Sequence, residues 1–212
     1  MSRRAASVES MGMLRKAIPA RLSRRSLLGL AGGFVAGLAA AAPSSGRDVT
    51  NEHLGGLIDL RDPSGRLRRL ADFRGKVVLL FFGYTRCPDV CPTTLLRVAE
   101  AIRALDAAEA ARVQVLWATV DPDRDTADLI GRYVQAFNPG FIGLRGSVAQ
   151  TDAVTAAFKF RYEITYYRGE VLVSHAPDGY VIDARGRTRV RIGYDASPEQ
   201  IARDVRSLLA QA

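Results

Sequence analysis

The most constraining feature of the sequence is a continuous apolar run that leads into the only two cysteines of the chain. Residues 77–82 read Val-Val-Leu-Leu-Phe-Phe, a pattern typical of a strand buried on both faces of a sheet. Cys87 and Cys91 follow, and the apolar residues between Leu95 and Leu105 then recur at helical spacing. A buried strand, a tight turn and a helix in this order predict an α/β fold.

The rest of the chain continues this alternation of strands and helices, with N-cap signals before three helices. In chain order we expect a strand over residues 113–120, a helix capped by Asp125, a helix with the capping box Ser147 and Gln150, a hairpin formed by residues 180–183 and 188–192, and a helix with the capping box Ser197 and Gln200. This order predicts a thioredoxin-like α/β fold, with a central mixed sheet flanked by helices and a late antiparallel hairpin.

Residues 1–42 have the pattern of an export signal. Arg24 and Arg25 precede residues 29–42, an uncharged run that consists only of Gly, Ala, Leu, Val and Phe. The paired arginines, preceded by Ser and followed by Ser-Leu-Leu, resemble a twin-arginine signal. We expect cleavage after Ala41. The alternative is an uncleaved anchor in the inner membrane, for which the run is short of the roughly 20 residues that span a bilayer.

This leader also carries most of the net charge of +8. Residues 1–46 contain seven cationic side chains and one anionic side chain, so the rest of the chain carries only +2. We therefore expect no nucleic-acid partner, and membrane contact only through an uncleaved leader. Residues 43–52 are expected to be a polar linker, and residues 53–212 a domain in the oxidising periplasm.

The cysteine pair has the placement of a reactive site. Pro92 is expected in the first turn of the following helix, which leaves Cys91 as the expected N-cap. The positive end of the helix dipole should then lower the pKa of its thiol and favour the thiolate, which attacks disulfides and binds soft metals. The alternative is a structural disulfide, although so short a loop gains little stability from closure. We therefore expect Cys87 and Cys91 to be a redox-active pair or metal ligands.

His175 is the third candidate ligand. It leads into the late hairpin, and in a thioredoxin-like sheet that segment lies opposite the cysteine turn, despite 84 residues of separation from Cys91. Two thiolates and one imidazole make a three-coordinate soft site, which suits Cu(I), or Cu(II) with one further weak ligand. Structural zinc usually takes a fourth protein ligand. His53, in the polar approach to the domain, is expected to have no part in the site.

These residues resemble the Sco/SenC family, the copper-binding thioredoxin-like proteins of cytochrome c oxidase assembly. The resemblance covers roughly residues 50–211 and rests on Gly75-Lys-Val-Val, on Phe82-Gly-Tyr-Thr-Arg-Cys-Pro-Asp-Val-Cys-Pro-Thr93, on Val120-Asp-Pro-Asp-Arg-Asp-Thr126, and on His175 placed eight residues before Asp183. It implies that Cys87, Cys91 and His175 are copper ligands. It further implies delivery of copper to the copper A site of cytochrome c oxidase subunit II, or to another periplasmic copper or thiol protein.

One segment departs from the family pattern. His175 is followed by Ala176-Pro-Asp-Gly179, where the family usually has apolar or hydroxyl-bearing residues. Proline removes a backbone donor and glycine weakens a strand. We therefore expect the next strand to begin near Tyr180 and the loop that carries His175 to be mobile, with a weaker hold on the metal.

Two charged segments are expected to be ordinary features of a turn and a surface. The first is the acidic turn at Asp121, Asp123, Arg124 and Asp125, which is typical of a capped strand-to-helix connection, with orientation of the site or of a partner as the alternative. The second is the alternating set Arg185, Arg187, Arg189 and Arg191, which predicts a solvated strand face, or alternatively a basic strip that docks an acidic partner.

Two functions are therefore open. The first is a periplasmic copper chaperone, which is not an enzyme. The second is a thiol-disulfide oxidoreductase that keeps the copper-ligand thiols of the oxidase reduced. The two are compatible, because thiols must be reduced before they bind copper. A peroxiredoxin-type peroxidase is disfavoured, since the pattern Pro-x-x-x-Thr-x-x-Cys occurs at neither cysteine.

Overall fold

A computed structural model of the chain describes residues 46–212. The export signal expected over residues 1–42 lies outside the described residues. The expected linker is partly folded, because Arg47–Asp48 forms strand β1 and Thr50–Glu52 forms a short 3-10 helix, η1. β1 pairs with the last strand of the central sheet, so the folded domain begins before the expected boundary at residue 53.

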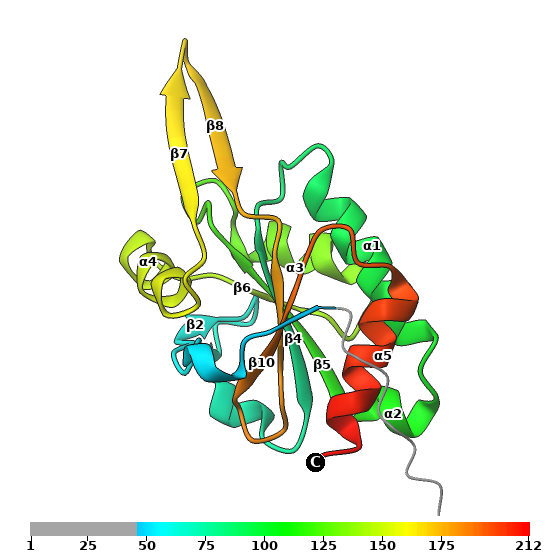
Figure 1. Ribbon diagram of the computed structural model, residues 1–212. Helices are drawn as coiled ribbons and strands as arrows, with labels where there is room; N and C mark the ends of the chain where they lie inside the picture. The colour runs from blue at the N-terminus through cyan, green and yellow to red at the C-terminus, as the bar shows by residue number, and fades with distance from the viewer. Residues whose placement is uncertain (1–45) are drawn as a thin grey trace, which may run out of the picture. The chain divides into compact units, whose positions relative to one another are not determined.

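Six strands form the central sheet of the domain (Figure 1). Besides β1 they are β4 Val77–Gly83, β5 Val113–Thr119, β6 Ile142–Leu144, β9 Gly179–Ile182 and β10 Thr188–Ile192. Their spatial order is β1-β10-β9-β4-β5-β6. β4, β5 and β6 are parallel, whereas β9 is antiparallel to β4 and β10 is antiparallel to β9. This arrangement confirms the predicted mixed sheet and the late antiparallel hairpin.

β4 lies inside the sheet, and all seven of its residues are buried. Successive side chains of a strand point to opposite faces, so β4 contributes to two apolar cores. Val77, Leu79 and Phe81 belong to one apolar cluster. Val78, Leu80 and Phe82 belong to the other. Helices and loops cover both faces of β4, and this explains why its apolar run is continuous.

Five α-helices and a second 3-10 helix surround the sheet. They are α1 Val90–Arg103, α2 Ala107–Ala111, α3 Ala127–Gln135, α4 Val148–Ala157, α5 Pro198–Leu209 and η2 Leu70–Phe73. α1, α3 and α5 contribute buried residues to one core, and α4 contributes to the other. The layers confirm the predicted thioredoxin-like α/β fold.

For the three helices that follow β5, the helix caps agree with the sequence at two of the expected positions. The capping boxes that begin with Ser147 and Ser197 start α4 and α5, as predicted. The expected cap of α3 was wrong. Thr126 is the cap, and its hydroxyl accepts a hydrogen bond from the backbone N–H of Leu129, which leaves Asp125 free for another role.

Two small antiparallel sheets were not expected from the sequence. One pairs β2 Leu60–Arg61 with β3 Leu67–Arg68, and the other pairs β7 Tyr162–Tyr167 with β8 Glu170–His175. β7 and β8 extend away from the central sheet (Figure 1). Arg168 and Gly169 join them, both at positive φ, as a type I′ hairpin turn requires. This hairpin bears on function because β8 ends at His175.

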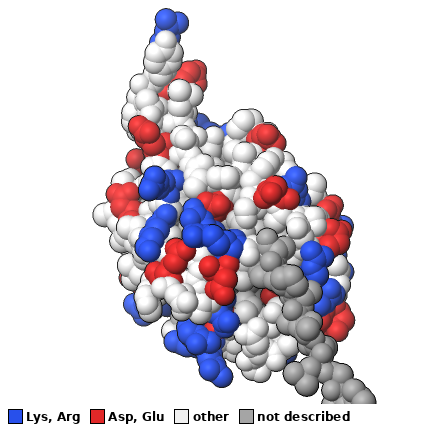
Figure 2. Space-filling view, viewed as in Figure 1, with Lys and Arg blue, Asp and Glu red and all other residues white. Residues whose placement is uncertain are grey.

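Acidic and basic side chains are intermingled on the face shown in Figure 2. Arg187 and Arg189 both pair with the carboxylate of Asp183, at 2.9 and 3.2 Å. Arg191 pairs with Asp178 at 2.5 Å. The alternating arginines are therefore not an open basic strip, since three of the four are engaged by carboxylates.

Candidate metal centre

The structure brings the three predicted ligands together. The Sγ atoms of Cys87 and Cys91 and a ring nitrogen of His175 all lie within 4.8 Å of one another. Nε2 of His175 is 3.5 Å from Sγ of Cys91. Both cysteines are free thiols. Among residues 46–212, no other group of three or more His, Cys, Asp or Glu side chains lies close enough together to bind one metal ion.

Cys87 lies in the turn between β4 and α1, and Cys91 lies in the first turn of α1. The chain leaves the sheet at Gly83, turns, and enters α1 at Val90, so Cys91 is the second residue of the helix. The expectation that Cys91 caps this helix was wrong, because the N-cap position belongs to Asp89. The backbone N–H of Cys91 donates a hydrogen bond to Sγ of Cys87, 3.4 Å away, so the two ligand residues are linked within this turn.

Burial dominates the chemistry of Cys91, whose side chain is only 4% exposed. Desolvation raises the pKa of the Cys91 thiol well above its ordinary value, although a backbone hydrogen bond from Tyr84 opposes the shift. The predicted lowering of this pKa by the helix dipole was therefore wrong, since the cost of burying a thiolate is larger. Cys91 holds its proton in the metal-free protein, whereas Cys87 is half-buried and accessible.

His175 is held in one orientation by its surroundings. Its Nδ1 lies 2.8 Å from the carbonyl oxygen of Ala176. A carbonyl only accepts hydrogen bonds, so Nδ1 is the donor, and in a neutral imidazole Nε2 then presents a lone pair towards Cys91. Phe160 stacks on the ring with centroids 5.9 Å apart, and Tyr84 meets it edge-on at 6.0 Å. Imidazoles that bind metals commonly donate their second N–H to such a carbonyl.

Asp125 is a site residue that the favoured sequence interpretation missed. It is fully buried, and its carboxylate accepts hydrogen bonds from the backbone N–H of Thr85 at 3.0 Å and from the Thr85 hydroxyl at 2.5 Å. The Thr119 hydroxyl donates to it from the end of β5, at 2.6 Å. Asp125 thus ties the cysteine turn to the sheet. The alternative expectation, that the acidic turn orients the site, fits this geometry.

Comparisons with known proteins identify the family of this chain. A family model described as SCO1/SenC matches residues 47–210. The chain belongs to the SCO1/SenC family. It is 39% identical over 169 residues to the mitochondrial SCO2 homologue of Bos taurus, an alignment that covers 73% of this chain and 59% of that protein. The chain thus spans about three fifths of the length of this mammalian relative.

Solved Sco structures share the fold. The structure of Bradyrhizobium japonicum ScoI with copper bound has a TM-score of 0.67 and 32% identity, and covers 74% of this chain and 99% of its own. The structure of Arabidopsis thaliana ScoI with copper bound has a TM-score of 0.70 and 28% identity, and covers 75% of this chain and 99% of its own. The resemblance inferred from the cysteine and acidic motifs is therefore confirmed.

The segment in which this SCO1/SenC protein departs from the family pattern is anchored at both ends. The N–H of Ala176 donates to the carbonyl of Arg161 at 3.0 Å. Gly179 is already the first residue of β9, close to the expected start at Tyr180. Residues 176–179, which were expected to form a mobile loop, are a short connection with a contact at each end.

Two further findings concern positions away from the site. His53 is exposed at the C-terminal end of η1 and does not belong to the ligand group, as predicted. None of the helices in the described part of the chain combines the length and apolar character needed to cross a bilayer.

Proposed function

We propose that this SCO1/SenC protein is a copper chaperone that binds one copper ion through Cys87, Cys91 and His175. The observation that carries the proposal is the convergence of two sulfurs and one imidazole nitrogen within 4.8 Å. Thiolate sulfur is a soft donor that favours Cu(I), and a neutral imidazole is compatible with both copper oxidation states. We further propose, from the family membership, that the recipient is the copper A site of cytochrome c oxidase subunit II.

The unequal exposure of the donors suggests an order of ligand exchange. Cys87 is half-buried and reachable, whereas Cys91 is 4% exposed and protonated in the metal-free protein. An arriving copper donor meets Cys87 first, and the proton of Cys91 leaves when its sulfur becomes a ligand. In the reverse direction an incoming thiolate can add to a three-coordinate ion before a ligand departs. His175, at the end of a hairpin, closes the site from the other side.

The test is a Cu(I) titration of the reduced full-length chain against a chromophoric chelator. We expect one copper per chain, and loss of tight binding in Cys87→Ser and Cys91→Ser. In the Cu(II) form, absorption from sulfur-to-copper charge transfer should appear in wild type and vanish in both variants. Failure of the reduced wild type to bind copper would refute the proposal.

A second function, thiol-disulfide exchange, is favoured by the placement of both free thiols in one turn. The Cys87 thiolate would attack a partner disulfide, forming a mixed disulfide and releasing one partner thiolate. Cys91 would then attack Cys87, so that the pair ends as a disulfide and the partner as two thiols. Two electrons pass to the partner. The Cys91→Ser variant should trap the mixed disulfide through Cys87. Absence of any trapped species would count against this function.

The expected leader would place this chemistry in the periplasm. We propose export through a twin-arginine-type signal within residues 1–42, with cleavage after Ala41. Expression of the full chain in a Gram-negative host should yield a periplasmic product whose mass is that of a chain beginning at Ala42. Replacement of Arg24 and Arg25 by Lys should abolish export. A full-mass product in the membrane fraction would instead identify the leader as an anchor.

A further inference from the structure

The orientation of His175 depends on the segment that follows it. The carbonyl of Ala176 accepts the Nδ1–H of the ring, so any displacement of Ala176 would release the imidazole. Ala176 is tied on one side to Arg161, through its N–H. On its C-terminal side only Pro177 and Asp178 separate it from β9, so the position of Asp178 decides where the carbonyl lies.

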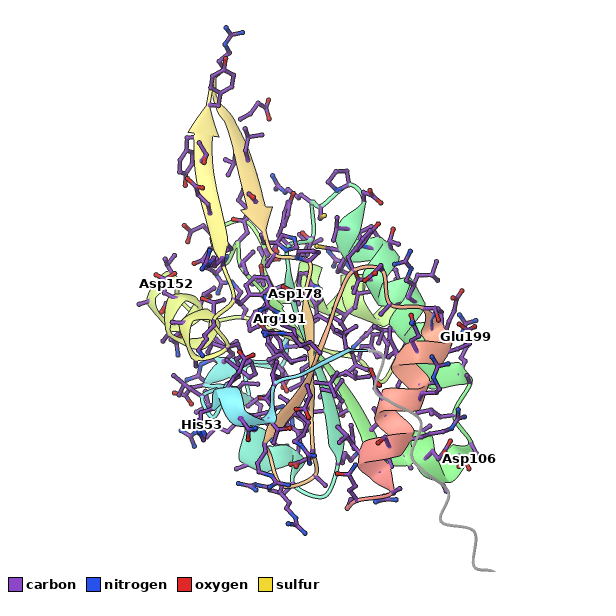
Figure 3. The ribbon with its side chains drawn as sticks, viewed as in Figure 1. His53, Asp106, Asp152, Asp178, Arg191 and Glu199 are labelled. Atoms are coloured by element: carbon purple, nitrogen blue, oxygen red, sulfur yellow. The ribbon has the colours of Figure 1, made fainter. Side chains whose placement is uncertain are left out.

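Asp178 is fixed by a charged partner on the neighbouring part of the sheet. Its Oδ2 lies 2.5 Å from Nη2 of Arg191, and the two side chains are 21% and 27% exposed. Arg191 belongs to β10, where it faces Tyr180 across the β9–β10 pairing. Figure 3 shows Asp178 and Arg191 next to each other at the strands of the central sheet. A half-buried ion pair of this kind is screened less than one at the surface.

Gly179 gives the same segment a second fixed point. It pairs with Phe81 of β4 and with Ile192 of β10, and a Cβ at this position would overlap the Phe81 ring. The backbone therefore approaches the sheet too closely for any other residue. The Asp178–Arg191 pair and Gly179 together hold the connection to His175.

The ion pair also borders the metal centre itself. Asp178 lines a small cavity that is shared with Cys91, Thr94 and His175. Arg191 engages the carboxylate, so the ligand sulfur does not face an uncompensated negative charge.

We propose that Asp178 and Arg191 are positioning residues for His175: their ion pair holds the 176–179 segment so that the Ala176 carbonyl fixes the Nδ1–H tautomer and Nε2 faces Cys91. The ion pair holds residues 176–179, the segment that departs from the family pattern. The inference rests on the proposed copper site for its effect on affinity, but its effect on the imidazole is independent of copper.

The first test follows the imidazole in the reduced, metal-free protein. The chain has only two histidines, so the ring nitrogens of His175 are readily assigned by ¹⁵N NMR, at a pH above the ordinary imidazole range. Wild type should show one protonated Nδ1 and one unprotonated Nε2. Asp178→Asn and Arg191→Gln should each give averaged nitrogen shifts, which signal exchange between tautomers. Wild-type shifts in both folded variants would overturn the proposal.

The second test measures Cu(I) affinity by competition. Each variant should weaken binding by about tenfold, the lower end of the range for outer-shell partners of metal-bound histidines. The double variant should lose no more than either single one, because both remove the same interaction. Arg189→Gln is the matched control. Arg189 lies on β10, as Arg191 does, but pairs with Asp183, so its replacement should leave the copper affinity unchanged.

The outcomes separate the two proposals. A wild type that binds no copper refutes the copper function, and the NMR measurement then decides the role of the ion pair alone. Wild-type affinity in both variants, or additive losses in the double variant, would show that the pair does not position His175.

Discussion

The Sγ of Cys91 and the Nε2 of His175 lie 3.5 Å apart although 84 residues separate them in the chain. One atom comes from the first turn of α1 and the other from the end of β8. The centre is thus assembled from two segments that meet only in the folded domain, and metal binding should be coupled to folding.

Replacement of His175 by Ala should weaken Cu(I) binding by more than about 100-fold, because a direct ligand contributes more than the outer-shell partners, which are worth about 10- to 100-fold. Competition with a chromophoric chelator measures the change. His53→Ala is the control, since His53 is exposed and outside the ligand group. Equal affinities for the two variants would contradict the assignment of His175.

Replacement of Asp125 by Asn should destabilise the domain by about 3 kcal/mol, because the buried carboxylate accepts three hydrogen bonds and an amide offers one acceptor oxygen. Urea unfolding of the metal-free protein measures the free energy of unfolding. Thr85→Ala removes one of these donors and should cost less. The two changes should be non-additive, because they act on one network. Additive losses would mean that Asp125 does not act through Thr85.

The stability of the metal-free protein should fall as the pH rises through the ordinary thiol pKa of about 8.5. Burial raises the pKa of Cys91, so the folded chain keeps this proton at a pH at which the unfolded chain has released it. Stability is therefore fully present below the unfolded pKa and declines above it, by at most about 1.4 kcal/mol per pH unit. Urea unfolding at about pH 7.5 and 9.5 measures the decline. Cys91→Ala should lack this component, and an unchanged slope in that variant would assign the decline to another group.

Gly83→Ala should disturb the metal centre, because Gly83 ends β4 and lies against Cys91. A Cβ at this position would lie 2.7 Å from Sγ of Cys91 and 3.1 Å from Nε1 of Trp117, so one of them must move. We expect a loss of about 1–3 kcal/mol of stability, as for other overpacked cores, together with weaker copper binding. The fluorescence of Trp117, the single tryptophan, reports the displacement. Gly140→Ala is the control, because its Cβ would meet only the Asn138 side chain, at 3.3 Å.

The sequence by itself determined the features that depend on local pattern. The apolar run that ends at Phe82 specified a strand with two covered faces, and the serines at 147 and 197 specified helix starts, since periodicity and capping involve neighbouring residues. The spacing of Cys87 and Cys91 after that strand was enough to identify a reactive turn and a family resemblance. The β7–β8 hairpin was not predicted because its strands are mostly exposed and β8 has only three consecutive apolar residues, at 171–173.

Only the tertiary structure decided the properties that arise from burial and from distant contacts. Local reasoning gave Cys91 a lowered pKa from the helix dipole, whereas packing removed its thiol from water and raised that pKa. Asp125 was expected to cap a helix, whereas in the folded domain β5 and the cysteine turn surround its carboxylate. The partner of Asp178, which lies just before β9, is Arg191, thirteen residues away on β10. Desolvation and pairing across strands depend on the whole packed domain, and no short stretch of sequence encodes them.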